Sequence, residues 1–324
     1  MKAMVYTEYG PPEVLQLKEV EKPTPKDNEV LIRIHAASVV YGDLALVTGK
    51  PFVARLSSGL RKPKYQIPGI DVAGRVEAVG SNVKQFQPGD EVFGDLSESG
   101  FGGFAENACP RENALALKPT NLTWEEAAAV PQAALVALQG LRDEGQIQPG
   151  QRVLINGASG GNGTFAVQIA KSFGAEVTGV CSTASLDMVR SIGADHVIDY
   201  TQEDFTQNEQ RYDLILDIVA NRSVSDYVRA LSPKGVYVAV AFNASALFLG
   251  PWISRRGSKK VSQYSHELSV KDLVFMKELL EAGKVVPVID RRYPLSEVAE
   301  ALRYYGEGHA RGKVVVTISQ AEVT

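Results

Sequence analysis

The sequence predicts an α/β protein in which a doubly wound parallel sheet accompanies a second domain of short strands. Three observations support this fold class. A glycine cluster follows an apolar run within residues 152–173, strand-like and helix-like segments then alternate as far as residue 240, and the first ~120 residues lack that alternation. The length of 324 residues also favours two domains, since single hydrophobic cores stop growing somewhere below about 300 residues.

The segment from Arg152 to Phe173 (RVLINGASGGNGTFAVQIAKSF) predicts a strand, a glycine turn and a helix. Its apolar start is typical of a buried parallel strand, and its end repeats apolar residues at helical spacing before Gly174. Such a turn presents backbone N–H groups and the positive end of a helix to a pyrophosphate. The predicted dinucleotide-binding residues here are Gly157, Ser159, Gly160, Gly161, Asn162 and Gly163.

The glycine spacing alone fits nucleotide binding and an ordinary tight turn equally well. The segments that follow favour nucleotide binding. A helix-like stretch at residues 186–192 is closed by Gly193. Strands that alternate with helices at this pitch imply βαβ units in a parallel sheet. We therefore assign residues 123–260 to a nucleotide-binding domain. The further predicted strands lie at residues 176–180, 196–199, 212–219 and 236–240.

The remaining residues, 1–122 and 261–324, are assigned to the other domain. Its N-terminal part has many short strand-like runs between glycine and proline turns, which is typical of an all-β barrel or sandwich. The C-terminal part predicts helices at 270–282 and 295–305 and a last strand at 313–318. The predicted N-terminal strands lie at residues 3–6, 15–20, 29–34, 72–79, 91–93 and 115–117.

Three connecting segments complete the prediction. Thr123, with Glu126 three residues later, has the pattern of a capped helix start, and a second helix is expected over 133–142. Residues 44–67 are expected to form an irregular loop whose basic side chains are either solvated or clamp a ligand. The apolar run 244–253 fits core, a dimer surface or a substrate wall.

Composition and charge exclude several classes of protein. A hydrophobic content of 44%, a charged content of 22% and a mean hydropathy of -0.08 are those of an ordinary globular protein. The net charge of -4 gives no support for a nucleic-acid surface. Neither a signal peptide nor a membrane span of ~20 apolar residues is predicted. The two cysteines, Cys109 and Cys181, fit reduced thiols, so a cytoplasmic protein is expected.

Six stretches together resemble the medium-chain dehydrogenase/reductase superfamily over almost the whole chain. Its zinc-independent quinone oxidoreductases, the zeta-crystallin-like branch, are the most similar. The resemblance implies a GroES-like β-barrel catalytic domain, a Rossmann domain and a homodimer. The stretches are PGIDVAGRVEAVG (68–80), QPGDEVFG (87–94), GGFAENA (102–108), INGASGGNGTFAVQIAK (155–171), GADHVIDY (193–200) and GHARGKVVV (308–316).

The resemblance also predicts that this chain binds no catalytic zinc. Zinc-dependent members place a Cys, a His-Glu pair and a Cys where this chain has Val40, Ile70-Asp71 and Gln132. Catalytic zinc needs three protein ligands, which an apolar Val and Ile cannot supply. Gly42 replaces the hydroxyl of their proton relay, and two cysteines cannot form a four-cysteine zinc lobe.

Without a Lewis acid, the expected reaction is hydride transfer from a reduced nicotinamide to a quinone or an α,β-unsaturated carbonyl. Tyr41 is the candidate for positioning the substrate or donating a proton, although a wall aromatic fits as well. Val40, Gln132 and Val136 are assigned to the substrate pocket. Val40 stands where zinc-independent relatives usually have Asn, and Val136 stands where they often have Thr. Asn162 replaces their usual Val in the glycine loop.

The expected cofactor is NADPH, with NADH as the alternative. NAD-preferring sites carry an acid at the end of the second strand, and this strand ends Cys181-Ser182-Thr183-Ala184. Relatives often have a basic residue nearby, where this chain has Ala184 and Asp187. By resemblance, Lys313 contacts the cofactor or the other domain, unless it is a plain surface lysine. The further predicted cofactor contacts are Ser182, Thr183, Tyr200, Ala241 and Phe242.

Two other functions fit the sequence. An enoyl-thioester reductase of the same superfamily is also zinc-free, and the basic residues within 55–64 would suit a phosphorylated carrier. A nucleotide-binding structural or regulatory protein with little turnover is supported by the apolar Val40 and Val136.

Overall fold

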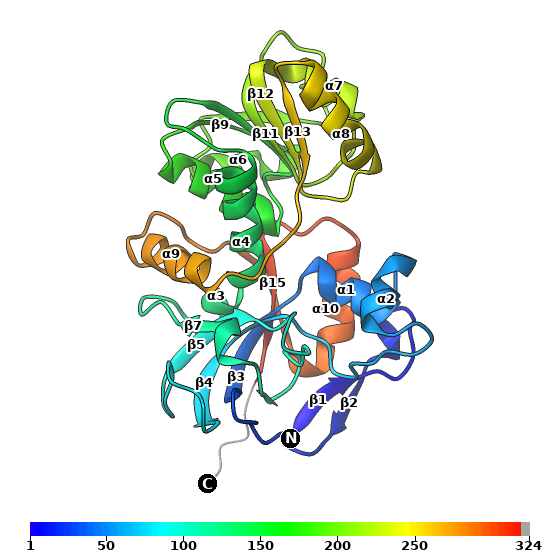
Figure 1. The fold of residues 1–324 in the computed structure, drawn as a ribbon, viewed down its shortest axis with the longest axis vertical. Helices are drawn as coiled ribbons and strands as arrows, with labels where there is room; N and C mark the ends of the chain where they lie inside the picture. Colours follow the sequence, from blue (N-terminus) through cyan, green and yellow to red (C-terminus); the bar gives the residue numbers. More distant parts are fainter. Residues whose placement is uncertain (319–324) are drawn as a thin grey trace. The chain divides into compact units, whose positions relative to one another are not determined.

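The computed structural model describes residues 1–318 and divides into two compact units (Figure 1). The first unit comprises residues 1–133, 268–281 and those from 287 onward, and the second comprises residues 134–267 and 282–286. The predicted fold class, a domain of short strands together with a doubly wound parallel sheet, is confirmed. Among the described residues, no helix is both long and apolar enough to cross a membrane.

The first unit is built on a mixed sheet with strand order β14-β15-β3-β4-β5-β7. A short strand β6 also pairs with β3, and β1 and β2 form a separate antiparallel pair. Apart from the parallel pair β14–β15, the neighbours in this sheet are antiparallel. The strands are β1 (Lys2–Val5), β2 (Gln16–Glu19), β3 (Val30–Ser38), β4 (Asp71–Val79), β5 (Glu91–Asp95), β6 (Asn107–Ala108), β7 (Leu115–Leu117), β14 (Ile289–Pro294) and β15 (Lys313–Thr317).

The buried sides of β3, β4 and β15 pack with helix α10 to form the core of this unit. Helix α3 begins as predicted, since Thr123 Oγ1 accepts from the N–H of Glu126 at 3.2 Å and the Glu126 carboxylate accepts from the N–H of Thr123 at 2.8 Å. The helices are α1 (Tyr41–Thr48), α2 (Arg55–Ser58), α3 (Trp124–Ala128), α9 (Val270–Glu281) and α10 (Val298–Gly306).

The prediction of an irregular loop at residues 44–67 is wrong for the first half of that segment. Residues 41–48 form α1, which ends at Gly49 with a φ of 61°, and short helical turns follow. Arg55 is not a free basic side chain, because it donates to the Gly49 carbonyl at 3.1 Å and its guanidinium lies 4.5 Å from the centre of the Tyr9 ring. Local capping and stacking therefore order this segment.

The second unit is a six-stranded, wholly parallel sheet of order β10-β9-β8-β11-β12-β13. The strands are β8 (Arg152–Asn156), β9 (Glu176–Cys181), β10 (His196–Asp199), β11 (Tyr212–Asp217), β12 (Leu231–Ala239) and β13 (Lys260–Gln263). The helices are α4 (Pro131–Gln139), which starts within the first unit, the π-helical turn Gly140–Glu144, α5 (Gly161–Ser172), α6 (Leu186–Ser191), α7 (Val224–Ala230) and α8 (Ala244–Arg256).

Three details of this unit differ from the sequence prediction. The edge strand β13 and helix α7 were not predicted, because neither is long enough to show a clear period. The strand expected at 236–240 begins at Leu231 and passes through Lys234, which has a φ of 68°. The apolar run 244–253 is not core: it lies in α8 and leaves Phe248 and Trp252 exposed, because only one side of that helix contacts the sheet.

Candidate functional site

The glycine turn between β8 and α5 has the conformation that a bound phosphate requires. Gly157 has a φ of 89°, a backbone conformation that residues with a side chain rarely adopt. A Cβ on Gly163 would lie 2.0 Å from the Gly157 carbonyl oxygen. The N–H groups of Gly157 and Ala158 donate to the Val180 carbonyl on β9, which fixes the turn. The first N–H groups of α5 have no acceptor within the helix and are available to an anion.

A Cβ added to Gly160 would have only the Gly157 oxygen near it, at 3.7 Å, so the space in front of the turn is open. This is the cradle that a side chain would fill, and it fits a pyrophosphate. Five of the six residues predicted for this role are partly exposed around that space, whereas Gly163 is buried against the turn. The arrangement therefore suits dinucleotide binding.

The buried carboxylate of Asp217, which the sequence did not indicate, holds the loop that packs against the glycine turn. Asp217 ends β11 and accepts from the side chain of Asn156 at 2.9 Å and from the hydroxyl of Tyr237 at 2.8 Å. It also accepts from the backbone N–H of Val219 at 3.2 Å and that of Ala220 at 3.0 Å. A Cβ on Gly157 would lie 2.7 Å from the Val219 side chain, so this loop presses on the glycine turn.

The end of β9 lies beside a carboxylate from the next strand. Asp199, the last residue of β10, pairs in register with Cys181 and accepts hydrogen bonds from the hydroxyls of Thr183 and Thr201. These hydrogen bonds hold the pKa of Asp199 below its usual range. β9 itself ends without an acid, but β10 supplies one beside that end. Strand register, which the sequence does not show, brings the charge there.

The other predicted cofactor contacts of this unit are mostly accessible. Tyr200 and Phe242 are exposed, and the Ala241 carbonyl accepts from the side chain of Gln263 at 3.4 Å. Asp187 points to solvent and pairs with Arg190 at 3.0 Å, so a basic side chain does lie on this helix, one turn after Asp187. Ser182 is also in this unit and is partly exposed, whereas Val136, assigned to the substrate pocket, is buried within α4.

Lys313 is not a surface lysine, and that alternative is wrong. It is the first residue of β15, its side chain is 3% exposed, and it pairs with Asp71 at 3.5 Å. Its ammonium group also donates to the Val39 carbonyl at 3.5 Å. Both faces of β15 are buried from Lys313 to Val316, so the charge of Lys313 needs the partner that β4 supplies.

Asp71, the first residue of β4, connects several positions that the sequence assigned to the substrate pocket. It accepts from the backbone N–H of Gln132 at 3.1 Å and from the hydroxyl of Ser38 at 3.2 Å. Burial raises the pKa of Asp71 to about 7, and Lys313 acts in the opposite direction. Asp43 is also buried, and its carboxylate accepts from the N–H of Val40 at 3.0 Å.

Two of the positions that hold zinc ligands in zinc-dependent relatives, Val40 and Ile70, are apolar here. Val40 and Ile70 are buried together with Leu46, and Phe101 packs against them. A Cβ on Gly42 would lie 2.5 Å from the end of the Ile70 side chain, so this position is closely packed. Within residues 1–318, no group of three or more His, Cys, Asp or Glu side chains is arranged to hold a metal ion.

Three phenols lie in this region, and the buried Tyr6 donates its hydroxyl to the Leu46 carbonyl at 3.4 Å. Tyr41, the first residue of α1, is 60% exposed and accessible to a substrate. Tyr305 on α10 was not singled out in the sequence. Burial raises its pKa to about 12, and Asp43 and Tyr41 contribute to the shift. No local motif marks Tyr305, because only the packing of α10 against α1 brings it here.

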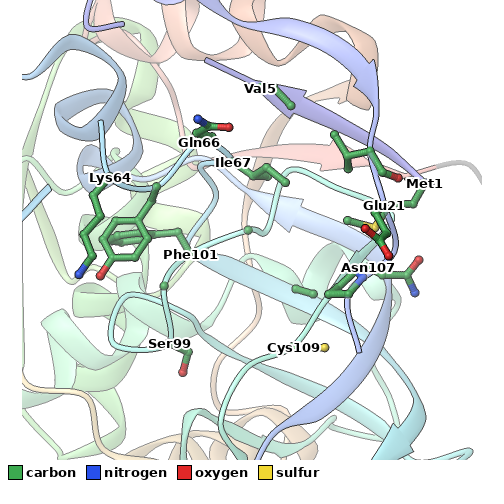
Figure 2. A pocket seen from close by; sticks show the side chains of 16 residues that line it. Met1, Val5, Glu21, Lys64, Gln66, Ile67, Ser99, Phe101, Asn107 and Cys109 are labelled. Carbon is green, nitrogen blue, oxygen red and sulfur yellow. Dashed lines mark hydrogen bonds between the residues drawn. The ribbon is translucent and has the colours of Figure 1, made fainter. Parts of the chain in front are cut away.

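A cavity of about 480 Å³ lies elsewhere in the first unit and contains none of the predicted site residues. Figure 2 shows Lys64, Phe101 and Ser99 on one side of it and Met1, Glu21 and Cys109 on the other. Phe101 lines this cavity and also packs against the apolar cluster around Val40. The edge of one ring meets the other where Phe101 contacts Tyr65, with the ring centres 5.0 Å apart.

Comparison with known proteins gives consistent matches. Residues 26–140 match the alcohol dehydrogenase GroES-like domain and residues 192–316 match the zinc-binding dehydrogenase family. The chain is 38% identical to 2-methylene-furan-3-one reductase of Solanum lycopersicum and 35% identical to the chloroplastic NADPH-dependent alkenal/one oxidoreductase of Arabidopsis thaliana. Each match covers 98% of this chain and 79% of the relative.

Solved structures of similar fold include the quinone oxidoreductase from Coxiella burnetii, with a TM-score of 0.89 and 29% identity over 98% of this chain and 99% of that one. The CurK enoyl reductase has a TM-score of 0.85 and 26% identity over 98% of this chain and 99% of its own.

Proposed function

Because the chain belongs to the medium-chain dehydrogenase/reductase superfamily, we propose that it transfers hydride from NADPH to a quinone or an α,β-unsaturated carbonyl without zinc. It is an oxidoreductase that uses a nicotinamide cofactor. The observation that carries the zinc-independent form of this proposal is the buried apolar pair Val40 and Ile70, which replaces two zinc-ligand positions and offers no donor atom.

The cofactor fits the glycine turn on structural grounds, because Gly157 to Gly163 leave an open space that a Cβ would fill. When bound, the reduced nicotinamide supplies the hydride. The N-terminal N–H groups of α5 hold the pyrophosphate, and Ser182, Thr183 and Tyr200 hold the adenosine end. Ala241, Phe242 and Lys313 are the remaining assigned cofactor residues. The name of one relative includes NADPH, which supports NADPH over NADH.

The substrate side is assigned to Val40, Tyr41, Gln132 and Val136. Val40 supplies an apolar wall that excludes water, which strengthens electrostatic interactions with the charge that develops on the substrate oxygen. Tyr41 has an accessible hydroxyl and is the assigned proton donor or positioning group.

The test is oxidation of NADPH and NADH with 1,4-benzoquinone, an alkyl enone and a crotonyl thioester, each with and without a chelator. The proposal expects turnover with the quinone or the enone and no effect of the chelator. Strong preference for the thioester would favour an enoyl-thioester reductase, which the structural similarity to an enoyl reductase supports. No oxidation with any acceptor would favour a nucleotide-binding protein of low turnover. Loss of activity in chelator, restored by zinc, would contradict the zinc-free mechanism.

We also propose that the chain forms a homodimer in a reducing compartment such as the cytoplasm. Leu247, Phe248, Leu249 and Trp252 on α8 are exposed, which supports a second copy covering this helix. The free cysteines support a reducing environment. Light scattering should give twice the chain mass of 35.0 kDa, and a monomer would contradict the dimer. Cell fractionation tests the location.

A further inference from the structure

Four ionisable side chains meet inside the first unit at one end of its sheet. Asp71 begins β4 and Asp95 ends β5, and these two residues are direct partners across the strands. Lys313 begins β15, and Asp43 reaches the same place from α1. All four are buried. Three carboxyl groups therefore face one lysine, and ionisation of all three would leave excess negative charge in the interior, where it is costly.

The contacts of Asp71 are those of an ionised carboxylate. One oxygen accepts from the backbone N–H of Gln132, and the other accepts from the hydroxyl of Ser38 and lies 3.5 Å from the ammonium group of Lys313. A cation and two hydrogen-bond donors compensate the charge for its loss of water.

The contacts of Asp43 are those of a neutral acid. Its Oδ2 accepts a hydrogen bond from Val40, and the backbone of Gly69 also acts to lower its pKa. Its Oδ1 is buried and has no partner within hydrogen-bond distance. The start of α1 favours a negative charge, but an ionised oxygen without a donor is expensive in the interior. The charged and titratable groups that face it are Asp71, Lys313 and the phenols of Tyr6 and Tyr305. Burial raises the pKa of Asp43 well above its usual range, Asp71 acts in the same direction, and Lys313 opposes both.

We propose that the ion pair of Asp71 with Lys313 positions the backbone at the substrate site, and that Asp43 in the same cluster is a neutral, protonated acid. This inference rests on the proposed function, which assigns Val40, Tyr41 and Gln132 to the substrate.

Each of three side chains in the cluster holds one piece of that backbone. Lys313 donates to the Val39 carbonyl, and Asp71 accepts from the N–H of Gln132. Asp43 accepts from the N–H of Val40. These three are positioning residues, because their interactions are with the backbone that carries the substrate residues. Loss of the ion pair would displace that backbone, and displacements of about 1 Å can cost on the order of 100-fold in rate.

Two aspartate-to-asparagine variants in one cluster form a matched pair. Asp71→Asn leaves a buried lysine without its counter-charge, so kcat should fall about 100-fold. Asp43→Asn replaces a neutral acid by a neutral amide that can still accept from Val40, so kcat should fall by less than about threefold. An equal loss in both variants, or full kcat in Asp71→Asn, would overturn the proposal.

Two further variants separate a fall in kcat caused by lost positioning from one caused by defective folding. The double variant Asp71→Asn/Lys313→Met removes both charges, so it should fold more stably than either single change while its kcat stays low. Lys118→Met removes another buried lysine, which donates to the Leu122 carbonyl and pairs with Glu91 at 3.3 Å. The Lys118→Met variant should have a lower free energy of unfolding than the wild type, with little change in kcat. If the double variant regains wild-type kcat, the ion pair has only a structural role.

The charge of Asp43 is tested without any turnover. A protonated Asp43 releases its proton on unfolding above about pH 4, because its pKa then returns to the ordinary value. Stability of the wild type should therefore fall relative to Asp43→Asn as the pH rises. The ratio of their unfolding constants in urea should change about tenfold per pH unit until the pKa of the folded state is reached.

A ratio independent of pH between 5 and 8 would show that Asp43 is ionised in the folded protein. This measurement remains decisive even if no acceptor is reduced, which would refute the proposed function alone. NADPH affinity, measured by fluorescence, should be unchanged in Asp43→Asn, Asp71→Asn and Lys118→Met, which keep Lys313. A loss of affinity in Asp71→Asn would show that the ion pair acts on the cofactor and would overturn the proposal.

Discussion

Replacing Gly163 by alanine tests the closest contact in the dinucleotide cradle. The new Cβ would lie 2.0 Å from the Gly157 carbonyl oxygen and 2.7 and 2.8 Å from the carbonyl carbon and Cα of Ala158. All three atoms belong to the backbone, so no change of side-chain rotamer can relieve the clash. Overpacking costs about 1–3 kcal/mol, and we expect the upper end because the turn itself must move by about 1 Å.

A loss of about 3 kcal/mol corresponds to a fall in Tm of roughly 6–12 °C for a domain of this size. Gly160→Ala is the matched control, because its Cβ would meet only the Gly157 oxygen at 3.7 Å. Gly160 precedes the first turn of α5, where alanine replaces glycine at a cost of at most about 1 kcal/mol. Its Cβ would nevertheless occupy the space proposed for the pyrophosphate, so NADPH affinity should fall at least about tenfold.

Both variants are measured by thermal unfolding without nucleotide and by titration with NADPH. The expected pattern is a large loss of Tm in Gly163→Ala and a loss mainly of affinity in Gly160→Ala. A wild-type Tm for Gly163→Ala would refute the close packing of the turn against α5. A wild-type affinity for Gly160→Ala would refute the placement of the pyrophosphate.

Three further predictions follow from single interactions. Tyr237→Phe removes a buried hydrogen bond to Asp217 and should lower the free energy of unfolding in urea by about 1.5–3 kcal/mol, whereas an unchanged value would mean that another donor replaces the hydroxyl. Asp199→Asn removes a negative charge beside the end of β9. Because that charge would repel the 2′-phosphate of NADPH, kcat/KM for NADPH relative to NADH should rise several-fold. An unchanged ratio would show that the 2′-phosphate binds away from Asp199. Partial or full burial raises the pKa of both thiols, Cys109 and Cys181, to about 11, so at pH 8 they should react with a disulfide reagent on the order of 100-fold more slowly than a free thiol. Rapid stoichiometric labelling would contradict these raised pKa values.

Local patterns were sufficient for the elements whose signals are local. The glycine turn at 157–163 could be predicted because positive φ and close helix packing demand glycine wherever they occur. The start of α3 could be predicted because a capping box lies within four residues, Thr123 to Glu126. The doubly wound sheet followed from the alternation of strands and helices.

Short or irregular elements were missed for a physical reason as well. The edge strand β13 has four residues, and its sequence KVSQ has no apolar run. It is a strand because β12 offers it an unpaired edge, and no property of the segment itself shows that.

The sequence by itself determined the type of each domain, the glycine cradle and the apolar residues at the zinc-ligand positions, since these depend on side-chain chemistry and short spacings. Only the tertiary structure decided which charges meet. Lys313 and Asp71 are 242 positions apart, and Asp199 reaches Thr183 through the register of β9 and β10. Burial and strand register set these partnerships, because a charge that leaves water must find its counterpart wherever the fold brings one within reach.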